Sequence, residues 1–151
     1  EPKPVFVVDE DGNPLKANDP HRFFEASWVH KHNGKYYLTF SQDSYKSVGY
    51  SVWYATSDSP TGPFKKHSSG PIFITDDIEQ KDTENPHLYG VGHHSFTTSK
   101  DGKTLICAYH CHSGNPENFK PRMFCLNTAE FVEGKNGEDE LVIHGPKSAD
   151  E

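Results

Sequence analysis

Four hairpin-type dipeptides divide this chain of 151 residues into short stretches and limit the folds that it can adopt. They are Asp11-Gly12, Asn33-Gly34, Asp101-Gly102 and Asn136-Gly137. Asn-Gly and Asp-Gly favour the tight turns that join adjacent antiparallel strands, because the central residues of such turns need a positive φ. The stretches between the dipeptides are rich in aromatic and β-branched residues and show no long helical period. The pattern predicts an all-β, antiparallel fold.

The composition agrees with a sheet protein. Hydrophobic residues make up only 32% of the chain, whereas aromatic residues reach 13%. The length corresponds to one domain with a core of its own. The alternation predicts strands at residues 5–8, 26–32, 35–41, 49–57, 92–99, 103–112, 122–131 and 140–145.

An internal repeat indicates how these strands are grouped. Residues 27–38, "SWVHKHNGKYYL", align with residues 95–106, "SFTTSKDGKTLI", at an offset of 68 and without a gap. Each copy provides three strands and has room for a fourth, and stacked units of four antiparallel strands build a β-propeller. We therefore expect one partial propeller domain over residues 1–151. Its blade-like units cover about 23–75 and 91–132, with flanking strands at 4–8 and 140–145.

The same offset places Glu25 on His93, two residues before the serine that begins the innermost strand of each unit. The first strand of each propeller blade lines the central channel. We therefore expect Glu25 and His93 to converge near the axis from neighbouring blades. His94 must alternate away from His93 along an extended strand, so one imidazole faces the channel and the other packs.

Three motifs resemble a known family. "FFEASWVHKHNGKYYLTFSQDS", "YATSDSPTGPF" and "GHHSF", in this order, resemble glycoside hydrolase family 43, whose members are five-bladed β-propellers. The resemblance runs from about Phe23 to Pro146. It implies that the chain is about two to two and a half blades from the carboxy-terminal half of a catalytic domain. It also implies that Glu25 is the general acid and that His93 lies at the propeller centre, near a calcium ion or water.

A general acid must be protonated near neutral pH, and apolar neighbours favour the protonated carboxyl. Phe23, Phe24 and Trp28 are the residues expected to supply that environment. The alternative is that Glu25 is a solvated edge residue. The candidate substrate or channel residues are His93, Trp28, Phe24 and His112, and His110 is a further candidate for the rim.

The segment "CAYHCHSG" contains two cysteines and two histidines, the residue types that bind zinc, but strand geometry argues against a zinc site. Cys107 and Cys111 stand ~13 Å apart on one face, and His110 and His112 stand ~7 Å apart. Ligands of one zinc ion lie at about 2 Å from the metal. No run of oxygen ligands typical of calcium loops is present either, so no cofactor is required, although the resemblance allows calcium beside His93. Three cysteines cannot all pair within one chain, and no disulfide framework is implied.

The resemblance implies an inverting glycosidase for plant-polysaccharide linkages of the xyloside or arabinofuranoside class. This chain would supply the general acid but not the base, which the family takes from another blade. None of the other candidate acids sits in a motif that matches that base: Asp19, Asp76, Asp77 and Glu84. Two arrangements would complete the propeller, an amino-terminal half or a second copy in a homodimer. The alternative function is a non-catalytic carbohydrate-binding half-propeller that self-associates.

Charge and hydropathy exclude other partners. The net charge of −7 and the absence of a Lys/Arg cluster argue against nucleic acid and against an anionic membrane surface. No apolar run approaches the ~20 residues of a membrane span. The chain begins with Glu1 and its one methionine is Met123, so we interpret it as a processed or excised piece. A secreted or periplasmic location is favoured, and a cytoplasmic one stays open.

Overall fold

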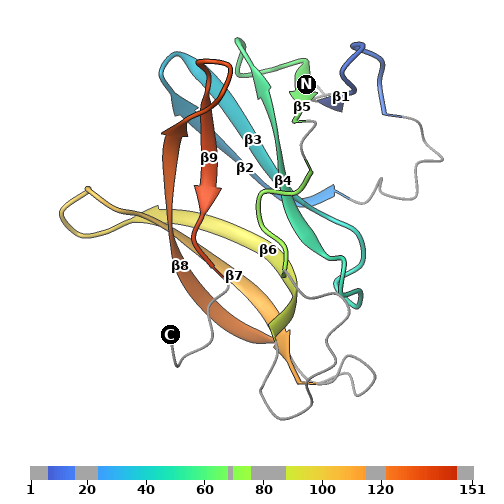
Figure 1. The fold of residues 1–151 in the computed structure, drawn as a ribbon, viewed down its shortest axis with the longest axis vertical. Helices are drawn as coiled ribbons and strands as arrows, with labels where there is room; N and C mark the ends of the chain where they lie inside the picture. Colours follow the sequence, from blue (N-terminus) through green and yellow to red (C-terminus); the bar gives the residue numbers. More distant parts are fainter. Residues whose placement is uncertain (1–6, 16–23, 68–69, 76–87, 115–121, 146–151) are drawn as a thin grey trace, which may run out of the picture.

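The computed structural model describes residues 7–15, 24–67, 70–75, 88–114 and 122–145. Within these ranges every regular element is a strand. Accordingly, no helix in the described part of the chain could cross a membrane. The strands form two sheets that pack against each other (Figure 1). The all-β prediction is confirmed.

The first sheet has the order β1-β5-β4-β3-β2. Neighbouring strands are antiparallel except for β1, which pairs in parallel with β5. The strand expected at residues 4–8 is therefore not a separate flanking element, because its described part, β1, forms the outer edge of this sheet. β5 is the fourth strand for which the repeat left room. The strands are β1 (Val7–Val8), β2 (Phe24–His32), β3 (Lys35–Gln42), β4 (Ser51–Ser57) and β5 (Phe64–Lys66).

The second sheet is antiparallel throughout, with the order β6-β7-β8-β9. The strand expected at residues 140–145 is β9, and it completes this sheet instead of flanking it. The reason is the Asn136-Gly137 turn, which joins β8 directly to its antiparallel neighbour. The strands are β6 (Leu88–Thr98), β7 (Leu105–Ser113), β8 (Met123–Glu133) and β9 (Asp139–Ile143).

The main core lies between the two sheets. Val52 and Phe73, on the side of the first sheet, belong to one buried cluster with side chains of the second sheet. The rings of Phe73 and Tyr109 meet edge to face at a centroid distance of 4.7 Å. A smaller cluster occupies the opposite face of the first sheet. It consists of Leu38, Phe40, Ala55 and Phe64.

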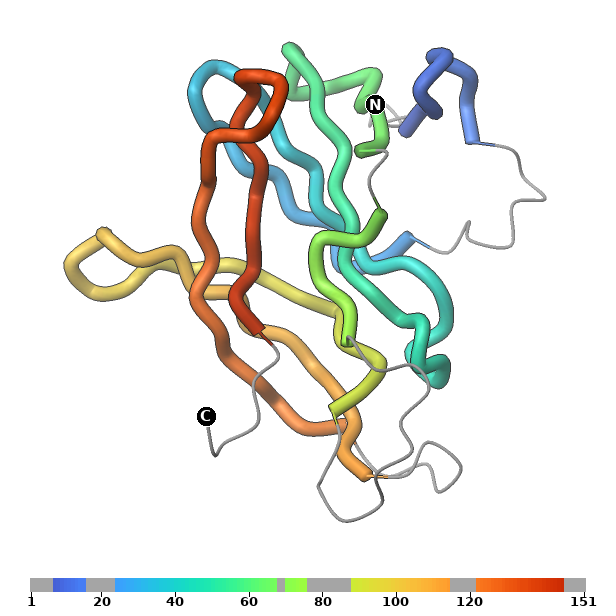
Figure 2. Tube along the Cα trace, in the orientation of Figure 1, coloured from blue at the N-terminus to red at the C-terminus, as the bar shows by residue number. Residues whose placement is uncertain are grey.

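The ends of two hairpins, one from each sheet, lie side by side (Figure 2), and polar side chains join them. His32 Nε2 lies 2.8 Å from Asp139 Oδ2, and the Asn33 side-chain amide donates to the same oxygen at 2.6 Å. The His32 ring also stacks on Phe131 at a centroid distance of 3.9 Å. The Tyr37 hydroxyl donates to the backbone oxygen of Asp139 at 2.7 Å. These contacts fix the sheets at the end remote from Glu25.

Each innermost strand carries a β-bulge. β2 and β6 lie at the edges of their sheets and contact each other. The β2–β3 register shifts between Glu25 and Trp28, and the β6–β7 register shifts between Gly92 and Ser95. Each bulge contains one non-glycine residue with a φ of 52°, Ala26 in β2 and His93 in β6. Such a conformation is uncommon for residues with a Cβ and re-aims the neighbouring side chains.

The bulges show which residues of the two inner strands hold equivalent positions. Glu25 corresponds to Gly92 and Trp28 corresponds to Ser95, an offset of 67. After the hairpin, Thr39 corresponds to Ala108, an offset of 69, because the second hairpin is two residues longer. The ungapped offset of 68 falls between these values. The prediction that Glu25 and His93 hold equivalent places is therefore wrong by one residue.

Candidate active site

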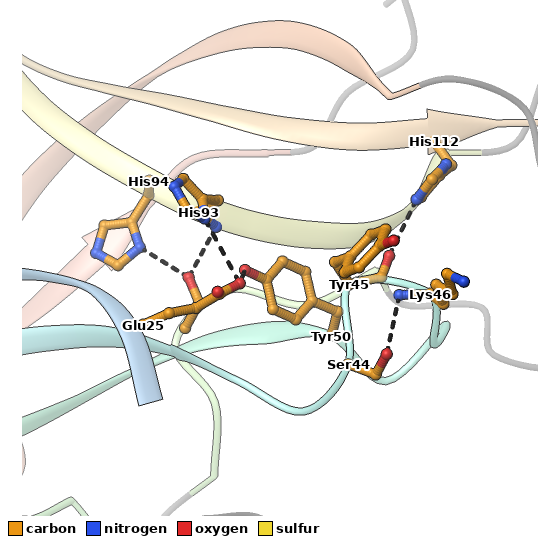
Figure 3. A network of polar contacts seen from close by, with 9 residues as sticks. Glu25, Ser44, Tyr45, Lys46, Tyr50, His93, His94 and His112 are labelled. Atoms are coloured by element: carbon orange, nitrogen blue, oxygen red, sulfur yellow. Dashed lines mark hydrogen bonds and ion pairs between the residues drawn. The ribbon is translucent and has the colours of Figure 1, made fainter. Parts of the chain in front are cut away.

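Glu25 lies on β2 immediately before the bulge, where it pairs with Ser41 of β3. Its Oε1 accepts a hydrogen bond from the hydroxyl of Tyr50 (Figure 3). Tyr50 is fully buried, and burial together with the bond to Glu25 raises the pKa of its hydroxyl. Tyr50 therefore stays protonated and acts as a fixed donor that orients the carboxyl group.

His93 reaches the same carboxyl group from β6. Its Nδ1 lies 3.5 Å from Glu25 Oε1, and its backbone N–H donates to the Ser41 hydroxyl at 2.8 Å (Figure 3). The side chains of His93 and Glu25 are 52% and 46% exposed. The structure thus brings the two predicted residues together from neighbouring sheets and leaves both open to solvent.

His94 points the other way and is only 3% exposed. Its Nδ1 lies 3.2 Å from the Ser41 hydroxyl and its Nε2 lies 2.8 Å from the Thr39 hydroxyl. Burial lowers the pKa of His94 from its ordinary value of 6.5 to about 4. His94 is therefore a neutral structural residue beneath the site, and the two adjacent imidazoles divide their roles as expected.

Gly92 makes room for Tyr50. A Cβ on residue 92 would lie 2.2 Å from Cε1 of the Tyr50 ring, far closer than two carbon atoms can approach. Only glycine allows the ring to lie against the β6 backbone and reach Glu25. Neither Tyr50 nor Gly92 was among the residues predicted for the site. The glycine before the histidine pair in "VGHHS" was the available signal, but its partner lies 42 residues away in the chain.

Arg122 is a cationic residue near the site that no motif indicated. Its guanidinium lies over the Tyr45 ring at 5.0 Å, and its Nη1 is buried without a hydrogen-bond partner among the described residues. Burial is the main cause that lowers the pKa of His110, and the charges of Arg122 and His93 act in the same direction. The His110 ring lies 6.1 Å from that of His93. Arg122 thus adds positive potential on the His93 side of the site.

The other predicted substrate or channel residues do not all lie on the Glu25 face of the sheet. Trp28 shares the Glu25 face of β2, because their partners Thr39 and Ser41 are two residues apart on β3. Its ring lies 6.5 Å from Phe96 and it is 40% exposed.

Phe24 and His112 do not face the Glu25 carboxyl group. Phe24 packs edge-on against Phe40 at 4.7 Å, on the opposite face of the sheet. It therefore cannot supply the apolar surroundings expected of it. His112 is 2% exposed, its Nε2 lies 3.0 Å from the backbone oxygen of Tyr45, and its ring stacks on Tyr89. Its burial contradicts the expected place at the rim.

Among the residues that the structure describes, no group of three or more His, Cys, Asp or Glu side chains could hold a metal ion. A calcium ion beside His93 stays a prediction. The Asp43 carboxylate accepts hydrogen bonds from the Ser44 N–H and the Ser47 hydroxyl within the β3–β4 turn. Several residues considered in the sequence lie outside the described ranges: Asp19, Phe23, Asp76, Asp77 and Glu84.

The innermost strands of the two sheets present a carboxyl group and an imidazole to one open space, and this arrangement defines the class of the protein. The sheets are blades of a β-propeller with a polar centre. The family model described as glycosyl hydrolases family 43 matches residues 4–136. The chain belongs to this family.

Similar proteins carry glycosidase names. A β-xylosidase of Xylanibacter ruminicola is 54% identical over 63 residues, 42% of this chain and 18% of the relative. A xylosidase/arabinosidase of Bacteroides ovatus is 52% identical over 65 residues, 42% of this chain and 19% of the relative. The crystal structure of a thermostable family-43 glycoside hydrolase has a TM-score of 0.64 and 33% identity, covering 82% of this chain and 36% of that one. The chain therefore spans less than a fifth of those two curated relatives.

Proposed function

We propose that the chain is part of an inverting glycosidase and that Glu25 is its general acid. The observation that carries the proposal is the position of the Glu25 carboxyl group. It is oriented by the Tyr50 hydroxyl, lies 3.5 Å from His93 Nδ1 and is open to solvent on one side. A positioned carboxylic acid of this kind protonates the leaving glycosidic oxygen.

The direction of the Tyr50 bond decides which oxygen carries the proton. Tyr50 donates to Oε1, so Oε1 acts as an acceptor, and the acidic proton belongs on Oε2. His93 approaches Oε1 as well. We therefore propose Tyr50 and His93 as positioning residues, and Oε2 as the atom that protonates the leaving oxygen.

The base comes from another part of the propeller. An inverting enzyme needs a second carboxylate about 6.5–9.5 Å from the acid to activate water. No described carboxylate other than Glu25 contacts Tyr50 or His93 in the hydrogen-bond and ion-pair network. We propose that an amino-terminal half, or a second copy of this chain, contributes the base.

The proposed substrates are xylosides and arabinofuranosides of plant polysaccharides, because the two relatives above are named β-xylosidase and xylosidase/arabinosidase. A polysaccharide is too large to cross a membrane, which favours a secreted or periplasmic location. Cell fractionation tests that location, and recovery of the protein from the cytoplasm alone would contradict it.

The test of the acid uses Glu25→Gln in the complete propeller and substrates with different leaving groups. Loss of a general acid costs about 10²–10⁴-fold in rate when the leaving group needs protonation. We expect that loss with xylobiose and a much smaller loss with 4-nitrophenyl xyloside, whose leaving group departs unprotonated. Glu133→Gln, at an exposed position at the end of β8, is the matched control and should leave both rates unchanged.

An equal loss with both substrates would contradict the role of Glu25 as acid. The solution mass of the 17.0 kDa chain, measured by light scattering beside the assay, separates the two sources of the base. Activity in a dimer would assign the base to a second copy. Binding of xylo-oligosaccharides without turnover by the complete propeller would instead support a carbohydrate-binding module.

A further inference from the structure

Two of the three cysteines face each other across the β7–β8 ladder. Cys111 Sγ lies 3.0 Å from Cys125 Sγ. Cys125 is opposite Tyr109, two residues from Cys111, so both thiols project from the same face of the sheet as diagonal neighbours. A disulfide has an S–S length of about 2.0 Å, so the sulfur atoms need to approach by about 1 Å.

We propose that Cys111 and Cys125 form an intramolecular disulfide by exchange with a small-molecule disulfide such as oxidised glutathione, while Cys107 stays reduced. Cys107 lies opposite Asn127 and is completely buried. An incoming disulfide cannot reach this buried thiol, and the sulfur in contact with Cys125 is that of Cys111.

The exposure of the two thiols sets the order of the steps. Cys125 is half-buried, whereas Cys111 is completely buried. An incoming disulfide therefore meets Cys125 first. Cys111 cannot be reached from solvent, but its sulfur lies 3.0 Å from that of Cys125, so Cys111 acts second, once its neighbour carries a leaving group.

The two thiols are oxidised in two exchange steps. The Cys125 thiolate attacks one sulfur of oxidised glutathione, the glutathione S–S bond breaks, and one glutathione leaves and takes up the proton that Cys125 released. The Cys111 thiolate then attacks the Cys125 sulfur of the mixed disulfide, the Cys125–glutathione bond breaks, and the second glutathione leaves and takes up the proton that Cys111 released. Two protein thiols have lost two electrons, and one disulfide has become two thiols.

The bond would tie β7 to β8 beside His110, whose ring lies 6.1 Å from His93. It would close a loop between residues 111 and 125 and raise the melting temperature by roughly 5–10 °C. Such a bond persists in an oxidising compartment and is reduced in the cytosol. The pair therefore provides a covalent link near the candidate active site that depends on the compartment.

The test equilibrates the purified 151-residue chain with an excess of oxidised over reduced glutathione, quenches with an alkylating reagent and maps the peptides without reduction. We expect a peptide pair joining Cys111 to Cys125, lighter by two hydrogens than the reduced pair, and an alkylated Cys107. A bond that includes Cys107, links only between chains, or three alkylated cysteines would each overturn the proposal. This measurement needs no variant.

Melting curves with and without reductant supply the matched comparison. Wild type and Cys107→Ser should both melt about 5–10 °C higher when oxidised. Cys111→Ser should show no such shift and should instead keep a glutathione adduct on Cys125. A shift of the same size in oxidised Cys111→Ser would overturn the proposal.

Discussion

The strongest pH dependence that we expect in the free energy of unfolding comes from His94. Its ring is 3% exposed, and each ring nitrogen lies against a hydroxyl, of Ser41 or Thr39. The hydroxyls can accept from a protonated ring as well as bond to a neutral one, so the cost of protonation is the burial of charge. Burial lowers the pKa to about 4 in the folded chain.

The size of this contribution to the free energy of unfolding follows from the pKa of His94 in the unfolded and the folded chain. The pKa is about 6.5 in the unfolded chain and about 4 in the folded one. Between these values the unfolded chain binds more protons, so stability falls as the pH falls. The contribution is intact above pH 6.5 and is lost by about pH 4, a total of about 3 kcal/mol at 1.36 kcal/mol per pKa unit. His30, whose pKa burial also lowers to about 4, acts in the same direction.

The assay is urea unfolding followed by tryptophan fluorescence at a series of pH values from 7.5 to 4. His94→Gln should reduce the dependence of the unfolding free energy on pH by up to about 1.4 kcal/mol per unit. His144→Gln is the control, because the His144 side chain is 44% exposed and pairs with Glu130 at the surface.

Equal pH slopes for the wild type and His94→Gln would refute the reasoning. If the variant does not fold, a nuclear magnetic resonance titration of the wild-type His94 ring decides the matter. A midpoint near 6.5 would show that burial does not depress its protonation.

Two further predictions concern single contacts. Gly92→Ala should push the Tyr50 ring away from Glu25, destabilise the chain by about 1–3 kcal/mol and lower glycosidase activity; an unchanged urea midpoint would contradict the tight contact. Asp139→Ala should cost about 1–2 kcal/mol in urea unfolding, because it removes the partner of two side chains that join the sheets. Glu138→Ala, which breaks only an ion pair whose carboxylate is 62% exposed, should cost less than about 1 kcal/mol, and an equal cost for both variants would refute the distinction.

The strands were predictable because their alternation and their hairpin dipeptides agree. β9 was placed outside its sheet because the repeat was matched over three strands only. β5 consists of the three residues Phe64–Lys66 and is too short for a periodic pattern to identify it. Its place in the sheet depends on pairing with β4, which is a tertiary contact.

The site was predictable in part. The internal repeat predicted that Glu25 and His93 converge, the resemblance to the family supplied their expected roles, and the structure places them 3.5 Å apart. Tyr50 and Gly92 could not be paired from the sequence, because their contact forms only when β6 lies across the first sheet. Phe24 was misplaced because adjacent residues of a strand face opposite sides, and Phe24 directly precedes Glu25 ahead of the bulge.

The unequal hairpins matter for anyone who recombines propeller blades. A chimera joined where the sequences match without a gap would shift the inner strand by one residue relative to its bulge. Because side chains alternate along a strand, that shift would turn the carboxyl group of Glu25 to the opposite face of the first sheet, where Phe40 packs, and bring the Phe24 ring to the candidate active site. Crossover points for building new glycosidases from such blades should therefore be chosen at the left-handed residues, Ala26 and His93, whose backbone marks equivalent positions.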